Sequence, residues 1–499
     1  MLKRMIALLT VICMMAVMFV ACSDPSDKTP EATKGGTGNN NPSESSNSLF
    51  KPIKDSLPEL NFDGEVINVV LRSDERYSGE FMVDENDTNA VSSAIFKRNT
   101  MVQERFDVDI EFYPIGNGHG PWSDIENSIF TGTCKYDIVV GSSSPASAQF
   151  QKGLYRNLRN IDYIDFSKEY WSQGIIDNQT IAGATYGITG SISTYFYDSA
   201  FVIYFNRDLC IANDIDPDEV YGLVMDGKWT LEEMMTMTKD IWIDDGDGTP
   251  DEGDVFGFGL QVTSATDGFT SSCLVDYINE SETGIEIAMD LAKVSDIVDK
   301  LNSFLWDNEG VCGLVEGAGY VANDLYLFDK QFASDKLLFV TDWLYSTSTV
   351  TMRDMTSDFG VLPYPKYTVD QEYSTYVHDK YSLFSIPVSV SNDRVDMVGA
   401  VLEAMASEGH NTVMPAYYEK ALTSRYIRDP ESVQTMDIIV RNIFIDKLWS
   451  LDNRIPRYTL RYPVWNHTTD VASSYREYYD LSKSTLSDIF TLYAKYAEN

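Results

Sequence analysis

The sequence predicts an α/β fold, because strand-like and helix-like segments alternate along the first part of the chain. Residues 65–71 form a run rich in Val and Ile that is typical of a buried strand. Residues 90–106 place apolar side chains near helical spacing, and residues 108–112 then alternate as a strand. A second helix over residues 122–130 precedes another buried strand at residues 136–140. This order favours a mostly parallel sheet, in which ligands bind at loops that leave the carboxyl ends of the strands.

The later segments fit the same class. Residues 200–206 and 336–340 are apolar and strand-like. Thr230 is a good helix N-cap, and Glu233 follows three residues later as its capping-box partner. A further strand is expected at residues 381–388, where the chain would cross back towards its first part. The tail is mainly helical, with helices expected at residues 398–406, 431–445 and 473–497.

The first 21 residues are expected to form an export signal. Basic residues at positions 3 and 4 precede an apolar run from Met5 to Val20, and small residues follow. Cys22 comes directly after the expected cut and resembles the lipidated cysteine of a bacterial lipobox. Such a lipid would anchor the protein to the outer face of the cytoplasmic membrane. A plain secretory signal with an incidental cysteine is the alternative. The apolar run is shorter than the roughly 20 residues that a membrane span needs.

Residues 22–59 are expected to form a disordered tether. The stretch from Ser23 to Ser48 is composed almost entirely of small, polar and charged residues and has no large apolar side chain. Such a segment buries too little surface to offset the entropy of ordering it. A flexible segment of this kind would let a folded body stand away from the membrane.

The net charge bounds the partners of the chain. The sequence carries 76 acidic and 38 basic residues, for a formal charge of −38. Nucleic acid is excluded as an expected partner, because binding it requires basic patches. Broad docking on anionic lipid is excluded for the same reason, which leaves the lipid anchor as the expected membrane contact. We expect a monomer, with the acidic surface serving solubility.

The sequence lacks the common zinc, iron–sulfur, zincin, nucleophile-elbow and P-loop motifs. Cys134, Cys210, Cys273 and Cys312 are widely spaced, which excludes zinc and iron–sulfur patterns. Export permits disulfides, but buried free thiols are the preferred interpretation. The four histidines do not have metal-ligand spacing, and there is no nucleophile elbow, zincin motif or P-loop. These observations favour a protein that is not an enzyme and requires no cofactor.

Four pairs or runs of segments, taken in order, resemble the extracellular solute-binding proteins of bacterial ABC importers that bind sugars and oligosaccharides. They are residues 136–140 with 153–158, residues 186–189 with 204–209, residues 228–233, and residues 359–366. The resemblance implies a two-lobe, periplasmic-binding-protein-like (type II) α/β fold, with hinge strands and a ligand cleft between the lobes. The N-terminal lobe would comprise residues 60–192 plus 388–452, and the C-terminal lobe residues 193–387 plus 453–499. Closure around the ligand would create the form that a membrane permease recognises.

Candidate ligand contacts follow from these positions. Trp343 stands after a buried strand, where the family places an aromatic platform, and Asp342 beside it could accept hydrogen bonds from hydroxyl groups. Ser142, Ser143 and Ser144 lie at the end of a predicted parallel strand. The other candidates lie near the expected crossings or on flanking loops and helices: Tyr195, Tyr197, Trp229, Gln261, Asp267, Tyr376, His378, Asp379 and Trp465. The alternative for the aromatic residues is core packing, and Trp229 could simply staple the start of a helix.

An acidic loop between residues 244 and 254 resembles a calcium loop. Alignment on Gly248 places Asp245, Asp247, Asp251 and Asp254 at ligand positions of the 12-residue EF-hand pattern. Position one is then Ile243, which has no ligand side chain. A structural calcium ion and a plain acidic turn therefore remain alternatives.

The leading functional hypothesis is a lipid-anchored receptor that captures a sugar or oligosaccharide and delivers it to an ABC permease. One alternative is a tethered glycoside hydrolase, which needs two carboxylates facing a cleft. Another is a receptor for a non-sugar solute such as a peptide. The number of acidic residues leaves the first alternative open, and the sequence does not select among sugars.

Overall fold

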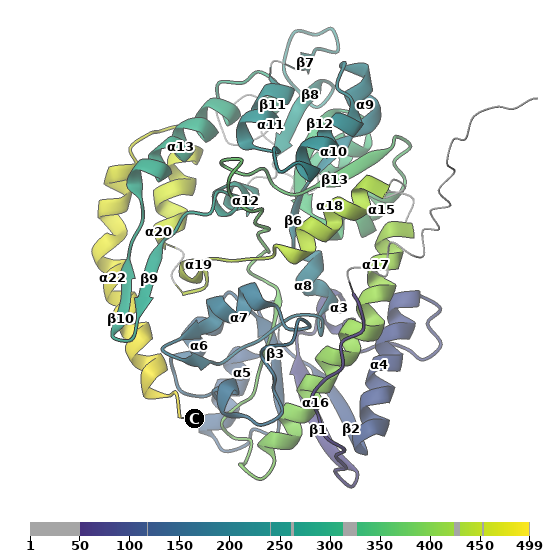
Figure 1. Cartoon of the computed structure of the whole chain (residues 1–499), viewed down its shortest axis with the longest axis vertical. Helices are drawn as coiled ribbons and strands as arrows, with labels where there is room; N and C mark the ends of the chain where they lie inside the picture. Colours follow the sequence, from purple (N-terminus) through teal and green to yellow (C-terminus); the bar gives the residue numbers. More distant parts are fainter. Residues whose placement is uncertain are drawn as a thin grey trace, which may run out of the picture. The chain divides into compact units, whose positions relative to one another are not determined.

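The computed structural model describes residues 50–116, 118–239, 241–260, 264–312, 327–423, 430–451 and 454–498. The expected signal peptide, Cys22 as the expected site of lipidation, and Gln261 lie outside these residues. The described chain contains two large sheets with helices packed around them (Figure 1). No helix in these ranges combines the length and the apolar character needed to cross a membrane.

The first sheet confirms the predicted parallel arrangement. Its order is β14–β3–β1–β2, in which β1 (Glu65–Leu71), β2 (Val108–Pro114) and β3 (Ile138–Ser142) are parallel. The last strand, β14 (Ser382–Ser385), returns from far along the chain and pairs antiparallel with β3. The five residues of β3 are all buried, as expected for a central parallel strand.

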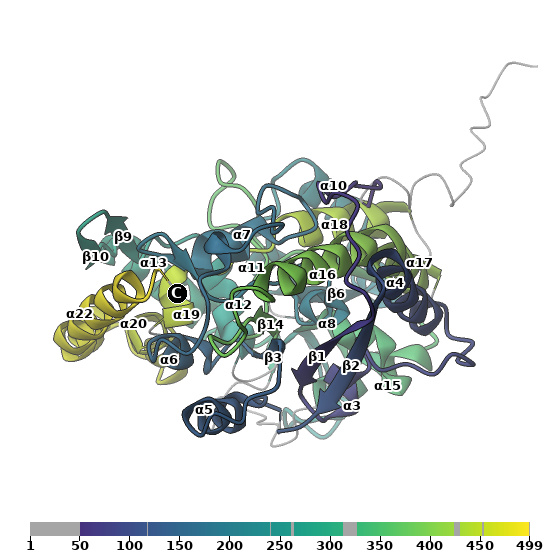
Figure 2. The same ribbon diagram turned by 90° about the horizontal axis from the view of Figure 1, so that it is seen from below.

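Helices α4 (Ala90–Phe106) and α16 (Val395–Glu408) pack together beside β1 and β2 (Figure 2). The helix α4 begins after Asn89, whose side chain accepts a hydrogen bond from Val91 N. It ends at Asp107, which has φ of 50°. The buried face of α4 includes Val91 and Val102, as the apolar spacing predicts.

The second sheet has the order β11–β8–β12–β6–β13, and a short β7 (Trp242–Ile243) pairs with β8. Its parallel part comprises β11 (Val311–Cys312), β8 (Val255–Leu260) and β12 (Leu337–Trp343). The strands β6 (Phe201–Asn206) and β13 (Phe359–Leu362) complete it in antiparallel pairing. Both β6 and β13 are buried along their whole length, so this sheet is covered on both faces.

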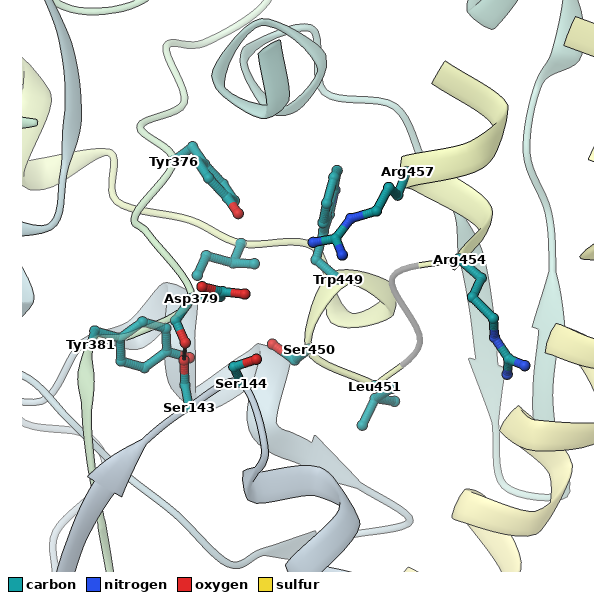
Figure 3. Close-up of a pocket in the computed structure, with 11 residues that line it drawn as sticks. Ser143, Ser144, Tyr376, Asp379, Tyr381, Trp449, Ser450, Leu451, Arg454 and Arg457 are labelled. Atoms are coloured by element: carbon teal, nitrogen blue, oxygen red, sulfur yellow. Dashed lines mark hydrogen bonds between the residues drawn. The ribbon is translucent and has the colours of Figure 1, made fainter. Parts of the chain in front are cut away.

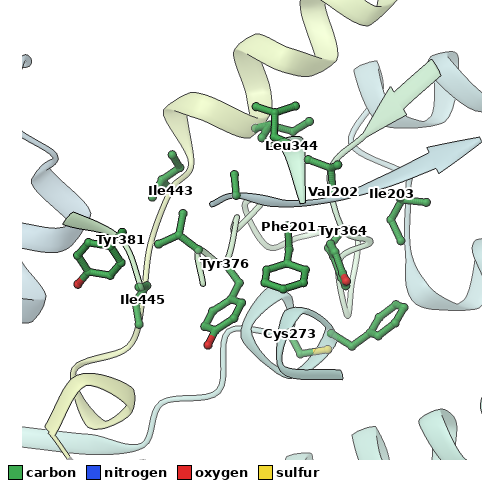
Figure 4. Packing of buried hydrophobic residues seen from close by; sticks show 14 of the residues in the cluster. Phe201, Val202, Ile203, Cys273, Leu344, Tyr364, Tyr376, Tyr381, Ile443 and Ile445 are labelled. Atoms are coloured by element: carbon green, nitrogen blue, oxygen red, sulfur yellow. The ribbon is translucent and has the colours of Figure 1, made fainter. Parts of the chain in front are cut away.

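Three segments run between the two sheets. The segment before β6 lies beside β14 and the segment that precedes β14, with the bridges Ile188–Phe384 and Ala200–Val377. A third segment joins them through the bridge between Thr375 and Ile443. Gly190 is required in the first crossing, because a Cβ there would lie 2.2 Å from the carbonyl oxygen of Tyr170. A buried apolar core continues from β6 into these crossings (Figure 4).

The helices after the crossings divide between the two sheets. The helix α18 (Pro430–Arg441) packs against β13 and α10 (Pro217–Met225), whereas α16 packs on the first sheet. The predicted N-terminal lobe includes both α16 and α18. The contacts of α18 with β13 and α10 place this helix with the second sheet instead. The other lobe boundaries stay a prediction. The long α22 (Val471–Lys495) packs against α13 (Leu291–Leu305) and α20 (Arg454–Pro456).

The remaining elements are short. They are α3 (Glu75–Ser78), α5 (Trp122–Phe130), α6 (Ala146–Phe150), η1 (Leu158–Asn160), α7 (Gln173–Gln179), β4 (Thr180–Ile181), β5 (Ala184–Thr185), α8 (Thr194–Asp198), α9 (Arg207–Ala212), α11 (Leu231–Thr238), α12 (Ser264–Ser272), β9 (Ile278–Ser281), β10 (Gly284–Ile287), α14 (Leu327–Ala333), η2 (Leu344–Ser348), α15 (Val350–Arg353), η3 (Gly409–Val413), α17 (Met414–Thr423), α19 (Lys447–Leu451), η4 (Arg457–Arg461) and α21 (Tyr462–Trp465). Thr230 caps α11 by accepting a hydrogen bond from Glu233 N, as predicted.

The predicted tether is too long at its C-terminal end, because residues 50–59 pack on the folded body. Phe50 is buried, and its ring lies 5.4 Å from that of His410 and 5.7 Å from that of Tyr418. The carboxylate of Asp55 pairs with Arg105, with Oδ2–Nη1 and Oδ1–Nη2 distances of 2.6 and 2.9 Å. Burial of Phe50 and the ion pair of Asp55 stabilise the packing of residues 50–59 on the body. The sequence from Ser23 to Ser48 has no large apolar residue that could be buried in this way.

The four cysteines of the folded body are free thiols, and three of them are buried. Burial raises the pKa of Cys210 and Cys273 to about 12, so both are protonated at neutral pH. This confirms the interpretation that they are structural apolar residues.

Candidate functional site

A pocket of about 420 Å³ lies where the end of β3 meets the crossing segments and the turn of α19 (Figure 3). It therefore occupies the place expected for a ligand in an open α/β sheet, outside the carboxyl end of a parallel strand. The residues that line it come from three separate parts of the chain: Ser143, Ser144, Tyr376, Asp379, Tyr381, Ile445, Trp449, Ser450, Leu451, Arg454 and Arg457.

One wall is formed by the loop after β3 and by the segment before β14. The hydroxyl groups of Ser142 and Ser143 donate to the carbonyl oxygen of Asp379, at 3.2 and 2.7 Å. The backbone N–H groups of Ser143 and Ser144 donate to the carbonyl oxygens of Tyr381 and Asp379. These bonds hold the serine loop against Asp379, whose side chain is 41% exposed. The wall thus offers hydroxyl groups and one accessible carboxylate to a polar ligand.

The opposite wall comes from the turn through α19, α20 and η4. The short helix α19 begins where Asp446 accepts a hydrogen bond from Leu448 N at 2.7 Å, and it places Trp449 in the pocket. The helix α20 brings Arg454 to the rim, where its guanidinium donates to Thr485 of α22 at 2.7 Å. The π-helical turn η4 then carries Arg457. Such π-helical turns are frequent at functional sites because they re-aim side chains.

An ion pair lies behind this wall. Asp267 of α12 and Arg461 of η4 are both buried, and Oδ2 lies 3.1 Å from Nη1. Burial raises the pKa of Asp267, and the positive charge of Arg457 opposes that shift. The structure therefore places Asp267 beneath the site, holding η4 against α12, rather than on an exposed loop in contact with a ligand.

A row of aromatic rings connects the pocket to the end of β12. The ring of Trp449 lies 5.9 Å from that of Tyr376, which lies 5.6 Å from that of Phe201. Beyond Phe201, the ring of His378 lies 4.6 Å from that of Trp343. Tyr376 and Trp449 line the pocket, whereas Phe201, Trp343 and His378 are not among its lining residues.

His378 is neutral at neutral pH. Burial lowers the pKa of His378 to about 4, although Asp379 Oδ1 lies only 3.2 Å from its Nδ1. His378 therefore brings no positive charge to the Asp379 carboxylate on the pocket wall. Asp342, next to Trp343, is also buried and accepts hydrogen bonds from Trp343 N at 2.7 Å and Ser346 Oγ at 2.5 Å. Its oxygens organise the turn after β12.

Several predicted contacts lie away from the pocket lining. Trp229 is completely buried, its indole N–H donates to the carbonyl oxygen of Pro363 at 3.0 Å, and its ring stacks on Phe339. That burial contradicts a ligand contact and supports the alternative of packing at a helix start. Tyr195 is buried against Tyr77, with ring centroids 4.8 Å apart.

Tyr197 and Trp465 also occupy other surroundings. Tyr197 is buried beside Phe50 and lines a separate pocket of about 260 Å³. Trp465 is half-buried on α21, where its indole N–H lies 3.4 Å from Thr266 Oγ1 and the guanidinium of Arg461 lies over its ring. Trp465 therefore packs around the ion pair behind the site.

The structure thus brings together Ser143, Ser144, Tyr376 and Asp379, with Ser142 as their support. Sequence reasoning missed Trp449, Ser450, Arg454 and Arg457, which share a helical tail with many other polar and aromatic residues. Their place in the pocket follows from the short helices between residues 447 and 461, which the structure shows and the local sequence does not announce.

The acidic loop gathers part of the predicted calcium ligand set. Oxygens of Asp245, Asp251 and Asp254 lie within 4.8 Å of one another. Asp247 instead groups with Asp244 and Asp245, so the four predicted residues do not form one ligand set. Asp254 is buried and accepts hydrogen bonds from Trp242 Nε1 and from the N–H of Asp245, both at 2.8 Å. A set of carboxylate oxygens fits the preference of calcium for hard oxygen ligands.

Comparisons with known proteins identify the fold. No protein-family model and no curated protein matches the sequence. Among solved structures, the chain is similar to a cyclic alpha-maltosyl-1,6-maltose binding protein from Arthrobacter globiformis. The TM-score is 0.55 with 12% identity, over 86% of this chain and 99% of that one. A sugar transporter from Rhizobium etli in an open conformation gives a TM-score of 0.54, 12% identity, and coverage of 84% and 99%.

A third similar structure is UgpB from Mycobacterium tuberculosis in complex with glycerophosphocholine. Its TM-score is 0.53 with 14% identity, over 86% of this chain and 99% of that one. At such low identity these matches show the fold alone. The chain has the two-lobe α/β fold of solute-binding proteins, as the sequence resemblance implied.

Proposed function

We propose that this chain is a solute-binding receptor of the ABC-importer type, which captures a sugar or oligosaccharide without altering it. The observation that carries the proposal is the position of the 420 Å³ pocket, at the segments that join the two sheets. In this fold, rotation about such segments opens and closes a ligand site. The similar structures with TM-scores of 0.50 or more include one that binds a cyclic maltosyl-maltose and one in complex with cycloalternan.

The chemistry of the pocket suits a carbohydrate. Trp449 and Tyr376 offer aromatic surface for the apolar face of a pyranose ring. Ser143, Ser144 and Asp379 offer groups that exchange hydrogen bonds with hydroxyls. Binding sites for small molecules generally combine apolar surface with a few placed polar groups in this way. A volume of 420 Å³ falls in the usual range for such sites.

The pocket does not favour glycoside hydrolysis. That reaction needs two carboxylates roughly 5–9 Å apart across the scissile bond. Among the described lining residues, Asp379 is the only carboxylate. Asp267, the other acidic group named at the site, is buried in its ion pair with Arg461. These two facts support a receptor rather than an enzyme.

The rest of the proposal concerns location and partners. We propose that Cys22 carries a lipid, that residues 23–49 form the tether, and that an ABC permease receives the ligand from a monomeric receptor. The basic and apolar leader before Cys22 and the polar composition after it support this arrangement. We also propose that the acidic loop binds a structural calcium ion through Asp245, Asp251 and Asp254.

The test is calorimetric titration of the full chain with a panel of neutral and acidic mono- and oligosaccharides, with chromatography of the incubated sugars. A receptor binds at least one saccharide, gains thermal stability from it and returns it unchanged. Release of shorter sugars would instead show a hydrolase. Binding of peptides but of no saccharide would show a receptor for another class of solute.

A further inference from the structure

Arg457 is a cationic residue in the lining of the pocket. Among the described residues it makes no hydrogen bond and no ion pair, and its Nε atom is buried without an acceptor. Figure 3 shows its guanidinium directed into the space beside Trp449. A guanidinium carries five N–H donors, which require acceptors when water is displaced. The binding of a ligand must therefore provide acceptors for Arg457.

Among the described residues, no carboxylate forms an ion pair with Arg457. The carboxylate of Asp267 lies behind the wall, where it contacts Arg461 at 3.1 Å and attracts Arg457 over a longer distance. Asp379 lies on the opposite wall, beside His378, and is not within ion-pair distance of Arg457. Arg454, at the rim, is held by Thr485. Arg457 is therefore the residue that gives the wall formed by α20 and η4 its cationic group facing the pocket.

This cationic group stands out in a chain of charge −38. Such a charge repels anions from the protein as a whole, so an anionic ligand needs a local cation to be held. A planar guanidinium matches the two oxygens of a carboxylate or the oxygens of a sulfate or phosphate. A neutral sugar offers this guanidinium only weak hydroxyl acceptors, whereas an anionic group offers charged ones.

We propose that the ligand is an acidic saccharide and that Arg457 is the residue that selects it, by binding the anionic group. The inference rests on the proposed function and adds the class of sugar. The pyranose ring would lie against Trp449 and Tyr376, and its hydroxyls would face Ser143 and Ser144. The carboxylate of Asp379 repels the anionic group from its own wall, so the two walls together fix the orientation of the ligand.

The experiment measures binding of three groups of oligosaccharides to the full chain: neutral malto-, xylo- and galacto-oligosaccharides, uronate oligosaccharides from pectin and alginate, and sulfated chondroitin disaccharides. We expect the tightest ligand to be acidic. Arg457→Gln should weaken it by about 10- to 100-fold, since a hydrogen-bonded charge is lost. Arg457→Lys keeps the charge but loses the fork, and should recover part of the affinity. Whether uronates or sulfated sugars show this dependence identifies the anionic group.

Arg476→Gln is the matched control, because Arg476 is an exposed arginine on α22 that donates only to Ser473. It should leave every affinity within about twofold. Thermal unfolding of both Arg457 variants is measured alongside, because Arg457 attracts the buried Asp267, and the titrations are run well below each midpoint so that lost affinity reports lost ligand contact. Preferential binding of neutral sugars, or an equal effect of Arg457→Gln on both classes, would overturn the inference and leave the receptor function intact. Binding of no saccharide of any group would overturn both.

Discussion

Replacing Trp449 by alanine tests the assignment of the pocket as the ligand site. Trp449 is half-buried on α19, and its ring lies 5.9 Å from that of Tyr376. The substitution removes the largest aromatic surface in the pocket lining. It leaves the serine loop and Asp379 in place, because the hydrogen bonds that join them run from Ser142 and Ser143 to the carbonyl oxygen of Asp379 and do not involve Trp449.

The size of the effect follows from what an aromatic anchor contributes. Truncation of a well-packed aromatic residue at the centre of a binding site costs about 2 kcal/mol or more. Loss of about 2–3 kcal/mol corresponds to a rise in Kd of about 30- to 150-fold. Because Trp449 is only partly buried, its removal should destabilise the fold by less than the 3–5 kcal/mol typical of a core Trp→Ala change.

The assay is calorimetric titration with the tightest saccharide of the panel, well below the unfolding midpoint of the variant. Trp343→Ala is the matched control. Trp343 was predicted from the sequence as the platform, but its ring lies against His378 and Phe201 behind the pocket. We expect its Kd to change by less than about threefold. An unchanged Kd for Trp449→Ala together with a large loss for Trp343→Ala would refute our placement of the site.

Three further predictions concern the fold. Burial raises the pKa of Glu403 to about 7, although Tyr170 and Trp171 donate hydrogen bonds to it. The folded state therefore keeps a proton that the unfolded chain releases above about pH 4.5, so stability falls by about 3 kcal/mol as the pH rises to 7 and beyond. Urea unfolding at about pH 5 and pH 8 should show this slope in the difference between the wild type and Glu403→Gln, and a constant difference would contradict it. Phe50→Ala should lower the free energy of unfolding by about 3 kcal/mol, because Phe50 is buried. Phe130→Ala is the control, because Phe130 is 69% exposed and its loss should change little. Equal effects of the two substitutions would mean that residues 50–59 belong to the tether, as the sequence predicted. Calcium at about 1 mM should raise the melting temperature of the wild type but not of Asp251→Asn, and chelator should reverse the rise; a calcium response that survives in Asp251→Asn would place the ion elsewhere.

Much of the fold could be read from local patterns. The helix predicted over residues 90–106 and the strand over residues 65–71 have these bounds in the structure. In both, the apolar period matches one kind of element, and caps or turns define the ends. The tether boundary was placed too late, because the energy that orders residues 50–59 comes from partners distant in sequence, including Arg105 and His410.

The site could be predicted only in part. Ser143 and Ser144 were identifiable because a loop after a parallel strand reaches a known edge of the sheet. Trp449 and Arg457 were not, because nothing in the local sequence distinguishes them from other aromatic and basic residues of the tail. For Trp229, the capping pattern correctly placed the residue just before a helix. The pattern could not show that Trp229 is 0% exposed, because its burial depends on Phe339 in a distant strand.

The order of strands and helices, the net acidic charge and the polar stretch after the apolar leader are properties of neighbouring residues and of composition, and the amino-acid sequence alone determined them. Contacts between residues far apart in the sequence decide three other features. They are the pairing of β14 with β3, the packing of η4 near the crossings, and the place of Arg457 in the pocket lining. Those contacts depend on how the faces of separate elements pack, and only the tertiary structure decided them.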